Sequence, residues 1–235
     1  LRRMIEWTVF ASARESTRYA INGVLWEVSG KELVMAATDG RRLSVAKGKL
    51  GSCRTKSVPN AIVPGKALSL FNRLPGDPEA SVAVKVSSNQ MLLRIGRAVI
   101  STNLVEGHFP KYQDVIPADC DRTVELNTAE FHSALKRAAL LTNEESKGVR
   151  LSFEDGCLTL SSRAPEQGEA TISLPVAYKG EPIAIGFNPV FLTDVLRVTH
   201  TDEVTFAFKE PNRPGVLRMG DAFTHVVMPV NLSSA

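Results

Sequence analysis

An internal repeat limits the possible folds of this chain more than any other feature of its sequence. The segment Leu93–Ala98 (LRIGRA) is matched 124 residues later by Leu217–Ala222 (LRMGDA). Upstream of each segment, an apolar stretch with strand character, Ala61–Pro64 or Ile183–Gly186, leads into an amphipathic helical stretch. Since both copies must fold alike, the repeat predicts two similar domains in tandem.

Each copy also opens with the pattern of a helix followed by a hairpin. Apolar residues recur at helical spacing over residues 4–10 and again over 131–139, where Asn127 or Thr128 supplies a helix start. Residues 24–35 and 149–160 alternate apolar and polar side chains on either side of a glycine-containing turn. We therefore predict an α+β fold, with two helices on one side of antiparallel sheets in each domain.

The seam between the copies is predicted near Ile116–Asp119, where a proline and small polar residues interrupt the pattern. This gives domains at 1–117 and 118–235. The second copy opens with a strand at Thr123–Leu126, and we expect the matching opening strand of the first copy to lie outside this sequence.

Composition narrows the class of protein. With 43% hydrophobic and 23% charged residues, the 235-residue chain can fill one large or two ordinary cores. No apolar run approaches the roughly 18 residues of a membrane helix, and residues 1–6 do not have the pattern of a leader. Three distant cysteines without a C-x-x-C pair fit reduced thiols. We therefore expect a cytoplasmic protein.

The charge is unevenly distributed between the two copies. Residues 1–117 carry 17 Lys and Arg against 9 Asp and Glu, whereas residues 118–235 carry 11 against 16. Basic residues recur on or beside the four expected helices, and these are predicted to face DNA without reading its sequence: Arg2, Arg3, Arg14, Lys66, Arg73, Lys136, Arg137 and Arg197. Ordinary solvated helix faces remain the alternative interpretation.

No constellation of catalytic residues stands out. Gly65-Lys66 lacks the rest of a phosphate-binding loop, and the nucleophile-elbow and zinc-helix motifs are missing. The four histidines have no metal-ligand spacing. Asp39, beside Arg41 and Arg42, is explained as well by an Asp-Gly hairpin turn as by a catalytic acid. We therefore expect no enzyme activity, no cofactor and no metal.

The last residues are unusually apolar, with His225–Leu232 interrupted by Pro229. A terminal segment of this kind either closes a sheet or lines a groove. The proline blocks continued strand pairing. The flexible Met228 side chain is suited to line a groove that binds short peptides.

Five segments of the chain, in order, resemble the bacterial sliding-clamp family, the beta subunits of DNA polymerase III: Arg18–Gly23, Ala37–Leu43, Gly107–Tyr112, Gly148–Leu151 and Val227–Val230. The resemblance covers the whole chain, but only the second and third of the family's three domains. It implies clamp-type domains, of which two chains form a ring around duplex DNA. The ring tethers a polymerase as a processivity factor, without making or breaking bonds, in the cytoplasm and at the nucleoid.

The resemblance also implies a peptide-binding groove and a dimer interface. Family partners are the replicative polymerase, the clamp loader's delta subunit, repair and translesion polymerases, ligase and mismatch-repair proteins, which insert short linear motifs. The groove residues implied here are Arg18, Ile21, Thr38, Gly40, Arg41, Arg42, Leu43, Pro110, Val115, Val226, Met228, Pro229, Val230 and Leu232. Leu140 and Leu141 would meet the first domain of another chain.

Some positions depart from the family pattern. Asn231 stands where the family usually has arginine, Ser233–Ala235 follow Leu232, and Asp114 lies where some relatives are basic. Without the first domain, this segment is expected to keep the groove but not to close the ring. The alternative class is a non-clamp DNA-binding protein or enzyme built on duplicated domains.

Overall fold

A computed structural model describes residues 1–15, 19–53, 58–77, 80–142, 148–164 and 168–231. The chain divides into two compact units. The first unit comprises Leu1–Val115 with Asp221–Phe223, and the second comprises Ile116–Gly220 with Thr224–Ala235. The two units are described separately below.

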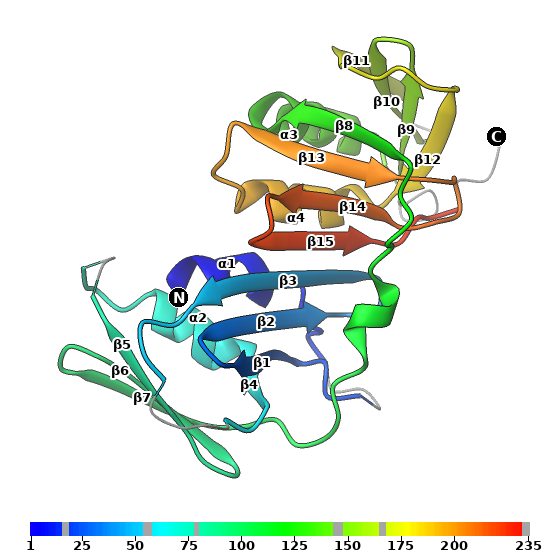
Figure 1. The fold of residues 1–235 in the computed structure, drawn as a ribbon. Coiled ribbons are helices and arrows are strands. Elements are labelled where there is room, and N and C mark those ends of the chain that lie inside the picture. Colours follow the sequence, from blue (N-terminus) through cyan, green and yellow to red (C-terminus); the bar gives the residue numbers. More distant parts are fainter. Residues whose placement is uncertain (16–18, 54–57, 78–79, 143–147, 165–167, 232–235) are drawn as a thin grey trace. The chain divides into compact units, whose positions relative to one another are not determined.

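The first unit contains two α-helices, seven strands and a short 3-10 helix among its described residues (Figure 1). Along the chain these are α1 (Arg2–Val9), β1 (Gly23–Ser29), β2 (Glu32–Thr38), β3 (Arg42–Lys49), β4 (Ala61–Pro64), α2 (Gly65–Asn72), β5 (Val82–Val86), β6 (Gln90–Ile95), β7 (Ala98–Asn103) and η1 (Tyr112–Val115). Strands β4-β1-β2-β3 are neighbours in that order, and β5-β6-β7 form a separate three-stranded sheet. These neighbouring strands pair in antiparallel fashion.

Apolar faces of the two helices build the core of the first unit. Helix α1 lies against α2 and against β2 and β3. Ile5 from α1 and Leu68 and Phe71 from α2 are fully buried, together with Val24 and Met35 from the sheet. Each helix thus buries its apolar face in the core and exposes its polar face.

The second unit repeats this order with one additional strand at its start. Its elements are β8 (Arg122–Asn127), α3 (Thr128–Ala139), β9 (Val149–Glu154), β10 (Cys157–Ala164), β11 (Gly168–Pro175), β12 (Ile183–Phe187), α4 (Pro189–Arg197), β13 (Glu203–Phe208), β14 (Gly215–Met219) and β15 (Phe223–Val227). Strands β11-β10-β9-β12 are neighbours in that order, and so are β15-β14-β13-β8. The correspondence with β3-β2-β1-β4 and β7-β6-β5 confirms the predicted α+β repeat.

Matching turns explain why the repeat was visible in the sequence. Gly96 follows β6 with a φ of 54°, and Gly220 follows β14 with a φ of 52°. Only glycine adopts this left-handed conformation without a steric cost, so both copies keep it. The hairpins at 24–35 and 149–160 are also confirmed, with turns at Gly30 and Gly156.

Aromatic packing fills the core of the second unit. Phe153 from β9 stacks on Phe208 from β13 at a centroid separation of 4.4 Å, and on Phe206 at 6.0 Å. Phe131 from α3 and Phe187 from β12 complete the cluster around Phe206. Such pairs contribute beyond their buried area, by roughly 0.5–1.5 kcal/mol each.

The helices of the second unit have side-chain caps. Asn127 accepts a hydrogen bond from the Glu130 amide at 3.0 Å and begins α3, which decides between the two predicted starts. Asn188 accepts from the Val190 amide at 3.0 Å and begins α4. Each cap satisfies an amide that the helix itself cannot pair.

Candidate functional site

The turn between β2 and β3 is the most ordered polar feature of the predicted groove. Gly40 has a φ of 86°, and its amide donates to the Thr38 hydroxyl at 3.0 Å. That hydroxyl donates in turn to the Arg42 carbonyl at 2.6 Å. Asp39 Oδ1 accepts from the Arg41 and Arg42 amides at 3.0 and 3.1 Å. The segment is therefore a fixed hairpin turn, as predicted from Asp-Gly.

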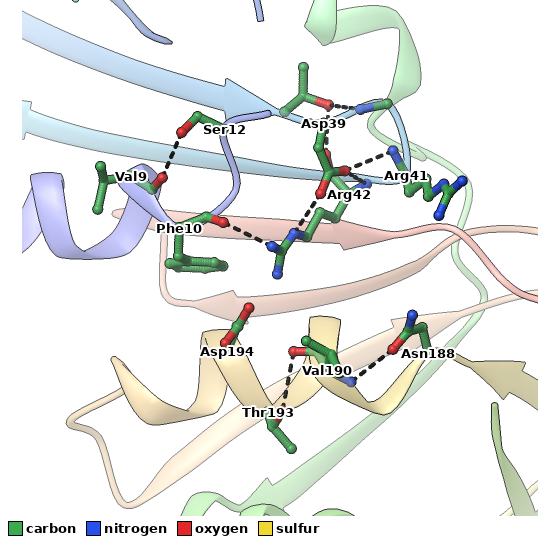
Figure 2. Close-up of polar contacts among 12 residues, drawn as sticks. Val9, Phe10, Ser12, Asp39, Arg41, Arg42, Asn188, Val190, Thr193 and Asp194 are labelled. Carbon is green, nitrogen blue, oxygen red and sulfur yellow. Dashed lines mark hydrogen bonds and ion pairs between the residues drawn. The ribbon is translucent and has the colours of Figure 1, made fainter. Parts of the chain in front are cut away.

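Arg42 is bound within the first unit. Its Nε donates to Asp39 Oδ2 at 3.0 Å, and its Nη2 donates to the Phe10 carbonyl at 2.9 Å (Figure 2). Its guanidinium also lies over the Phe10 ring, 5.4 Å from the centroid. Only 9% of the side chain is exposed. Arg42 therefore joins the turn to the end of α1.

Arg41 differs from its neighbour. The residue is exposed, and its hydrogen bond to Asp39 uses the backbone amide. In Figure 2 its side chain extends away from Asp39 and Phe10. Within the described ranges, its guanidinium has no hydrogen bond or ion pair. It is therefore available to a ligand.

The segment that carries Pro110 and Val115 is anchored through Tyr112. The buried Tyr112 hydroxyl donates to Glu27 Oε2 at 2.7 Å, and Asn60 donates to Glu27 Oε1 at 3.1 Å. Burial and the bond to this carboxylate raise the pKa of Tyr112 well above its usual value near 10. Three segments of the first unit are thus joined at β1.

The remaining groove residues of the first unit differ in exposure. Ile21 and Leu43 are only 8% and 2% exposed, whereas Val115 is 53% exposed. The Ala20 amide donates to the His108 carbonyl at 3.3 Å, which brings Ile21 close to the segment that precedes Pro110. The most accessible apolar side chain of this set is therefore Val115.

The other predicted groove residues belong to the second unit. Met228 is 44% exposed, and Val226 is 2% exposed. Pro229 and Val230 are half-buried, and the Val230 amide donates to the Gly186 carbonyl at 2.8 Å. This bond holds the segment after β15 against β12. Arg18 and Leu232 lie outside the described residues.

Most of the cations predicted to face DNA are exposed. They lie on or directly after the four helices, and they are Arg3, Arg14, Lys66, Arg73, Lys136, Arg137 and Arg197. Arg197 pairs with Asp194 at 3.2 Å, one turn away on α4. Exposed cations of this kind can meet phosphates at little desolvation cost.

Arg2 has a structural role that the sequence pattern did not show. Its Nη1 and Nη2 donate to the Asn72 and Leu74 carbonyls, both at 2.7 Å, and Asn72 donates back to the Arg2 carbonyl at 3.1 Å. The guanidinium also lies over Phe71 at 5.6 Å. Arg2 therefore satisfies carbonyls at the end of α2, a structural role that the exposed helix cations do not have.

Helices α3 and α4 contact each other and carry the exposed cations Lys136, Arg137 and Arg197. Partial burial, Lys136 and Arg197 together lower the pKa of His132 below its usual value. The lowered pKa keeps this imidazole mostly uncharged at pH 7.

The predicted dimer contact lies at the end of α3. Leu140 is 76% exposed, and Leu141 is half-buried. Nearby, α3 and β11 enclose a shallow pocket of about 450 Å³, lined by Ala129, Glu130, Ser133, Arg137, Leu174 and Pro175. Strand β11 is an edge strand of its four-stranded sheet, with β10 as its neighbour. No pattern in the sequence indicates this pocket.

Comparison with known proteins then identifies the family. A family model for the central domain of the DNA polymerase III beta subunit matches residues 1–111, and one for its C-terminal domain matches residues 113–231. The chain belongs to the DNA polymerase III beta subunit family.

Individual relatives agree with this assignment. The chain is 35% identical over 234 residues to the beta sliding clamp of Vibrio cholerae, covering 99% of this chain and 63% of that protein. The Escherichia coli K12 beta sliding clamp is 34% identical over 238 residues, with the same coverages. A crystal structure of the Pseudomonas aeruginosa DNA polymerase sliding clamp aligns with a TM-score of 0.92 and 33% identity, over 98% of this chain and 64% of that one. The chain thus spans somewhat less than two thirds of the length of these sliding clamps.

Two further observations concern possible sites. Within the described part of the chain, no group of three or more His, Cys, Asp or Glu side chains could hold a metal ion. The described helices include none long and apolar enough to cross a membrane.

Proposed function

We propose that this chain forms the central and C-terminal domains of a bacterial sliding clamp. In the whole protein, a ring-shaped dimer would encircle duplex DNA without sequence specificity and act as a processivity factor. The observation that carries this proposal is the consecutive match of the two family domains over residues 1–231. The domain boundary would lie between residues 111 and 118. The central-domain match ends at residue 111, and the predicted second domain begins at residue 118.

The part of this function that belongs to the present chain is the binding of short linear motifs. Partners would be the replicative polymerase, the clamp loader's delta subunit, repair and translesion polymerases, ligase and mismatch-repair proteins. The accessible apolar side chains Val115 and Met228 would contact a Leu/Phe pair, and the turn at Gly40 would lie beside the peptide. Burying two such side chains contributes about 3–6 kcal/mol before ordering costs.

DNA contact in the whole protein would use the exposed helix cations, with Arg2 removed from the set. Lys136, Arg137 and Arg197 support this because they are exposed on α3 and α4, two helices that contact each other. The chain would act as an accessory subunit without a cofactor or catalytic residues. It would work in the cytoplasm, at the nucleoid.

Homodimer formation would involve the end of α3 and the β11 edge. Leu140 is 76% exposed and is therefore accessible to a partner chain. The partner surface would be the first domain of another chain. The present chain alone would therefore not close a ring.

A peptide titration tests the motif-binding proposal. A fluorescently labelled Gln-Leu-x-Leu-Phe peptide would be titrated against the wild type, Met228→Ser and the matched control Val99→Ser, with anisotropy as the readout. Val99 is 58% exposed, but it lies on β7 in the three-stranded sheet. We expect micromolar binding by the wild type and the control, and weaker binding by Met228→Ser. Equal affinities for all three proteins would contradict the assignment of Met228.

DNA binding is tested separately. Linear duplex should bind weakly, with little sequence preference and a steep loss of affinity as salt rises. Lys136→Gln should reduce the salt dependence, whereas Arg94→Gln on β6 should not. Tight and sequence-selective binding would instead favour the alternative class of DNA-binding protein.

A further inference from the structure

The two faces of the three-stranded sheet β5-β6-β7 differ in burial (Figure 1). Met91, Leu93 and Ile95 of β6 are at most 6% exposed and form the covered face. Between them, Leu92 is half-buried and Arg94 is exposed. Because alternate residues of a strand point to opposite faces of a sheet, Leu92 and Arg94 belong to the other face, which we call the open face.

The strand register brings two cations together on the open face. Arg94 pairs with Ala83 of β5 and with Val99 of β7, while Leu92 pairs with Lys85 of β5. Lys85 and Arg94 are therefore diagonal neighbours on adjacent strands, a placement that sets Cα atoms about 7–8 Å apart. Both residues are exposed. Two positive charges thus lie side by side on this face.

The turn between β6 and β7 adds a third cation at the edge of the open face. Gly96 and Arg97 form this turn, and both are exposed. At the matching turn, between β14 and β15, Gly220 is followed by Asp221. The positive charge of Arg97 is therefore not a requirement of the turn itself, which the second copy builds with an acid.

The open face has no counter-charge of its own. Residues 80–105, which contain all three strands, include Lys85, Arg94 and Arg97 but not one Asp or Glu. Among the residues that the structure describes, none of these three side chains makes a hydrogen bond or an ion pair. On β13, the strand equivalent to β5, Thr205 instead donates to the Glu125 carboxylate at 2.8 Å. The positive charge of the open face is thus available to a partner.

Aliphatic side chains lie among these cations. Val99, opposite Arg94, is 58% exposed, and Leu92 lies opposite Lys85. Phosphates gain nothing from aliphatic neighbours, whereas the apolar side chains of a protein segment pack against them. Residues 80–105 also contain no aromatic side chain on which a nucleic-acid base could stack. The open face therefore suits an acidic protein segment better than a nucleic acid.

We propose that the open face of the β5-β6-β7 sheet is a docking surface for an acidic segment of a partner protein. Asp and Glu side chains of that segment would pair with Lys85, Arg94 and Arg97, and an aliphatic side chain between them would cover Val99. Arginine can hold a carboxylate through two parallel hydrogen bonds. None of these residues belongs to the predicted peptide groove, so the inference goes beyond the proposed function and does not depend on it.

The test is a titration of the full chain with a labelled acidic peptide, Gly-Asp-Glu-Leu-Asp-Glu-Leu-Asp-Glu-Gly, read by fluorescence anisotropy. A second peptide carries Asn and Gln in place of Asp and Glu, so it keeps the shape and loses the charge. A labelled single-stranded oligothymidylate serves as the nucleic-acid probe. The Gln-Leu-x-Leu-Phe peptide is titrated in parallel, because it reports on the groove alone.

The main variant, called the face variant, replaces the three cations of the open face and its edge by glutamine. A matched control removes the same charge from three exposed lysines elsewhere in the first unit, through Lys31→Gln, Lys47→Gln and Lys49→Gln. Lys49 lies opposite Glu32 in the strand register, so this control surface has mixed charge. Val99→Ser tests the aliphatic contact. Thermal melts establish that each variant is folded.

We expect the wild type to bind the acidic peptide saturably and the face variant to bind it about tenfold more weakly at about 50 mM salt, because three ion pairs are lost. The difference should largely disappear at about 1 M salt. Val99→Ser should weaken binding about twofold. The control should bind the acidic peptide as the wild type does. The amide peptide, the oligothymidylate and the Gln-Leu-x-Leu-Phe peptide should not distinguish the face variant from the wild type.

Four results would overturn the inference. Equal losses in the face variant and the control would show a general effect of net charge, and a folded wild type that does not bind the acidic peptide would leave the surface without its partner. If the face variant loses more affinity for oligothymidylate than for the acidic peptide, the face takes nucleic acid. A wild-type dimer that the face variant abolishes, measured by sedimentation, would assign the face to a second copy of the chain. Loss of Gln-Leu-x-Leu-Phe binding alone would instead refute the proposed groove and leave this inference standing.

Discussion

Strands β5 and β13 occupy equivalent places in the two units but differ in burial. On β13, Val204, Phe206 and Phe208 are at most 2% exposed. On β5, the alternate residues Val82 and Val86 are half-buried, and Val84 is 43% exposed. Strand β13 pairs with β8 on one side and β14 on the other, whereas β5 pairs only with β6 among the described strands.

We infer from this difference in burial that a second neighbouring strand, more than intrinsic strand propensity, decides how much a position contributes to stability. Val124 and Leu126 of β8, the strand beside β13, are 1% and 2% exposed, and Phe131 of α3 contacts Phe206 of β13. Because hydrophobic stabilisation follows the area removed from water, equivalent positions on β5 and β13 contribute differently to the free energy of unfolding.

The largest expected effect is that of Phe206→Ala. Phe206 is fully buried and contacts four other phenylalanine rings, so its removal should lower the free energy of unfolding by about 3–5 kcal/mol. Val84→Ala, at the equivalent edge position, should cost less than about 1 kcal/mol. Urea unfolding followed by circular dichroism measures both. Similar losses from the two substitutions would break the comparison.

Arg2→Ala is expected to have the next largest effect. In the first unit, helices α1 and α2 have no side-chain caps, and Arg2 satisfies carbonyls at the end of α2 instead. Loss of two charge-assisted bonds should cost about 2 kcal/mol. Both tryptophans, Trp7 and Trp26, belong to the first unit, so tryptophan fluorescence during unfolding reports on it. Lys66→Ala, which removes an exposed cation on α2, is the control and should cost less than about 0.5 kcal/mol.

Asn127→Ala tests how the second unit caps its helices. The substitution removes the acceptor for the Glu130 amide and should cost about 1 kcal/mol. Asn127→Asp keeps an acceptor and should retain most of the stability. If the alanine and aspartate variants unfold at the same urea concentration, the cap is unimportant and the contrast between the units weakens.

Tyr112→Phe should have the smallest effect at neutral pH, below about 1 kcal/mol, and a distinctive dependence on pH. The folded-state pKa of Tyr112 is raised, so its contribution is complete below its unfolded pKa near 10 and is lost as pH rises beyond that value. The difference in stability between wild type and Tyr112→Phe should therefore shrink above about pH 10. A difference that stays constant to higher pH would contradict the role of the bond to Glu27.

Local patterns predicted much of the fold from the sequence. The Asp-Gly and Ser-Gly turns and the Asn127 start of α3 depend on residues close in the chain, so their signals could be read directly. The LRIGRA repeat could be read by comparing the two halves of the chain. The exposure of most helix cations also followed from helical spacing.

Tertiary partners could not be predicted in this way. Arg2 bonds to carbonyls 70 and 72 positions away, and Tyr112 bonds to a carboxylate 85 positions away. Arg41 and Arg42 are indistinguishable in the sequence, and the contacts of Arg42 with Asp39 and the Phe10 carbonyl separate their roles. The spacing of charges shows where a cation lies on an element, but not whether another segment already binds it.

Methionine-methyl NMR tests the central claim, that this chain binds partner motifs, most directly. The chain has five methionines: Met4, Met35, Met91 and Met219 are at most 8% exposed, and Met228 is 44% exposed. With methyl-labelled protein and an unlabelled Gln-Leu-x-Leu-Phe peptide, we predict a large, saturable shift at Met228 and no comparable shift at Met91 on β6. No shift at any methyl at saturating peptide, or a shift at Met91 without one at Met228, would contradict the account.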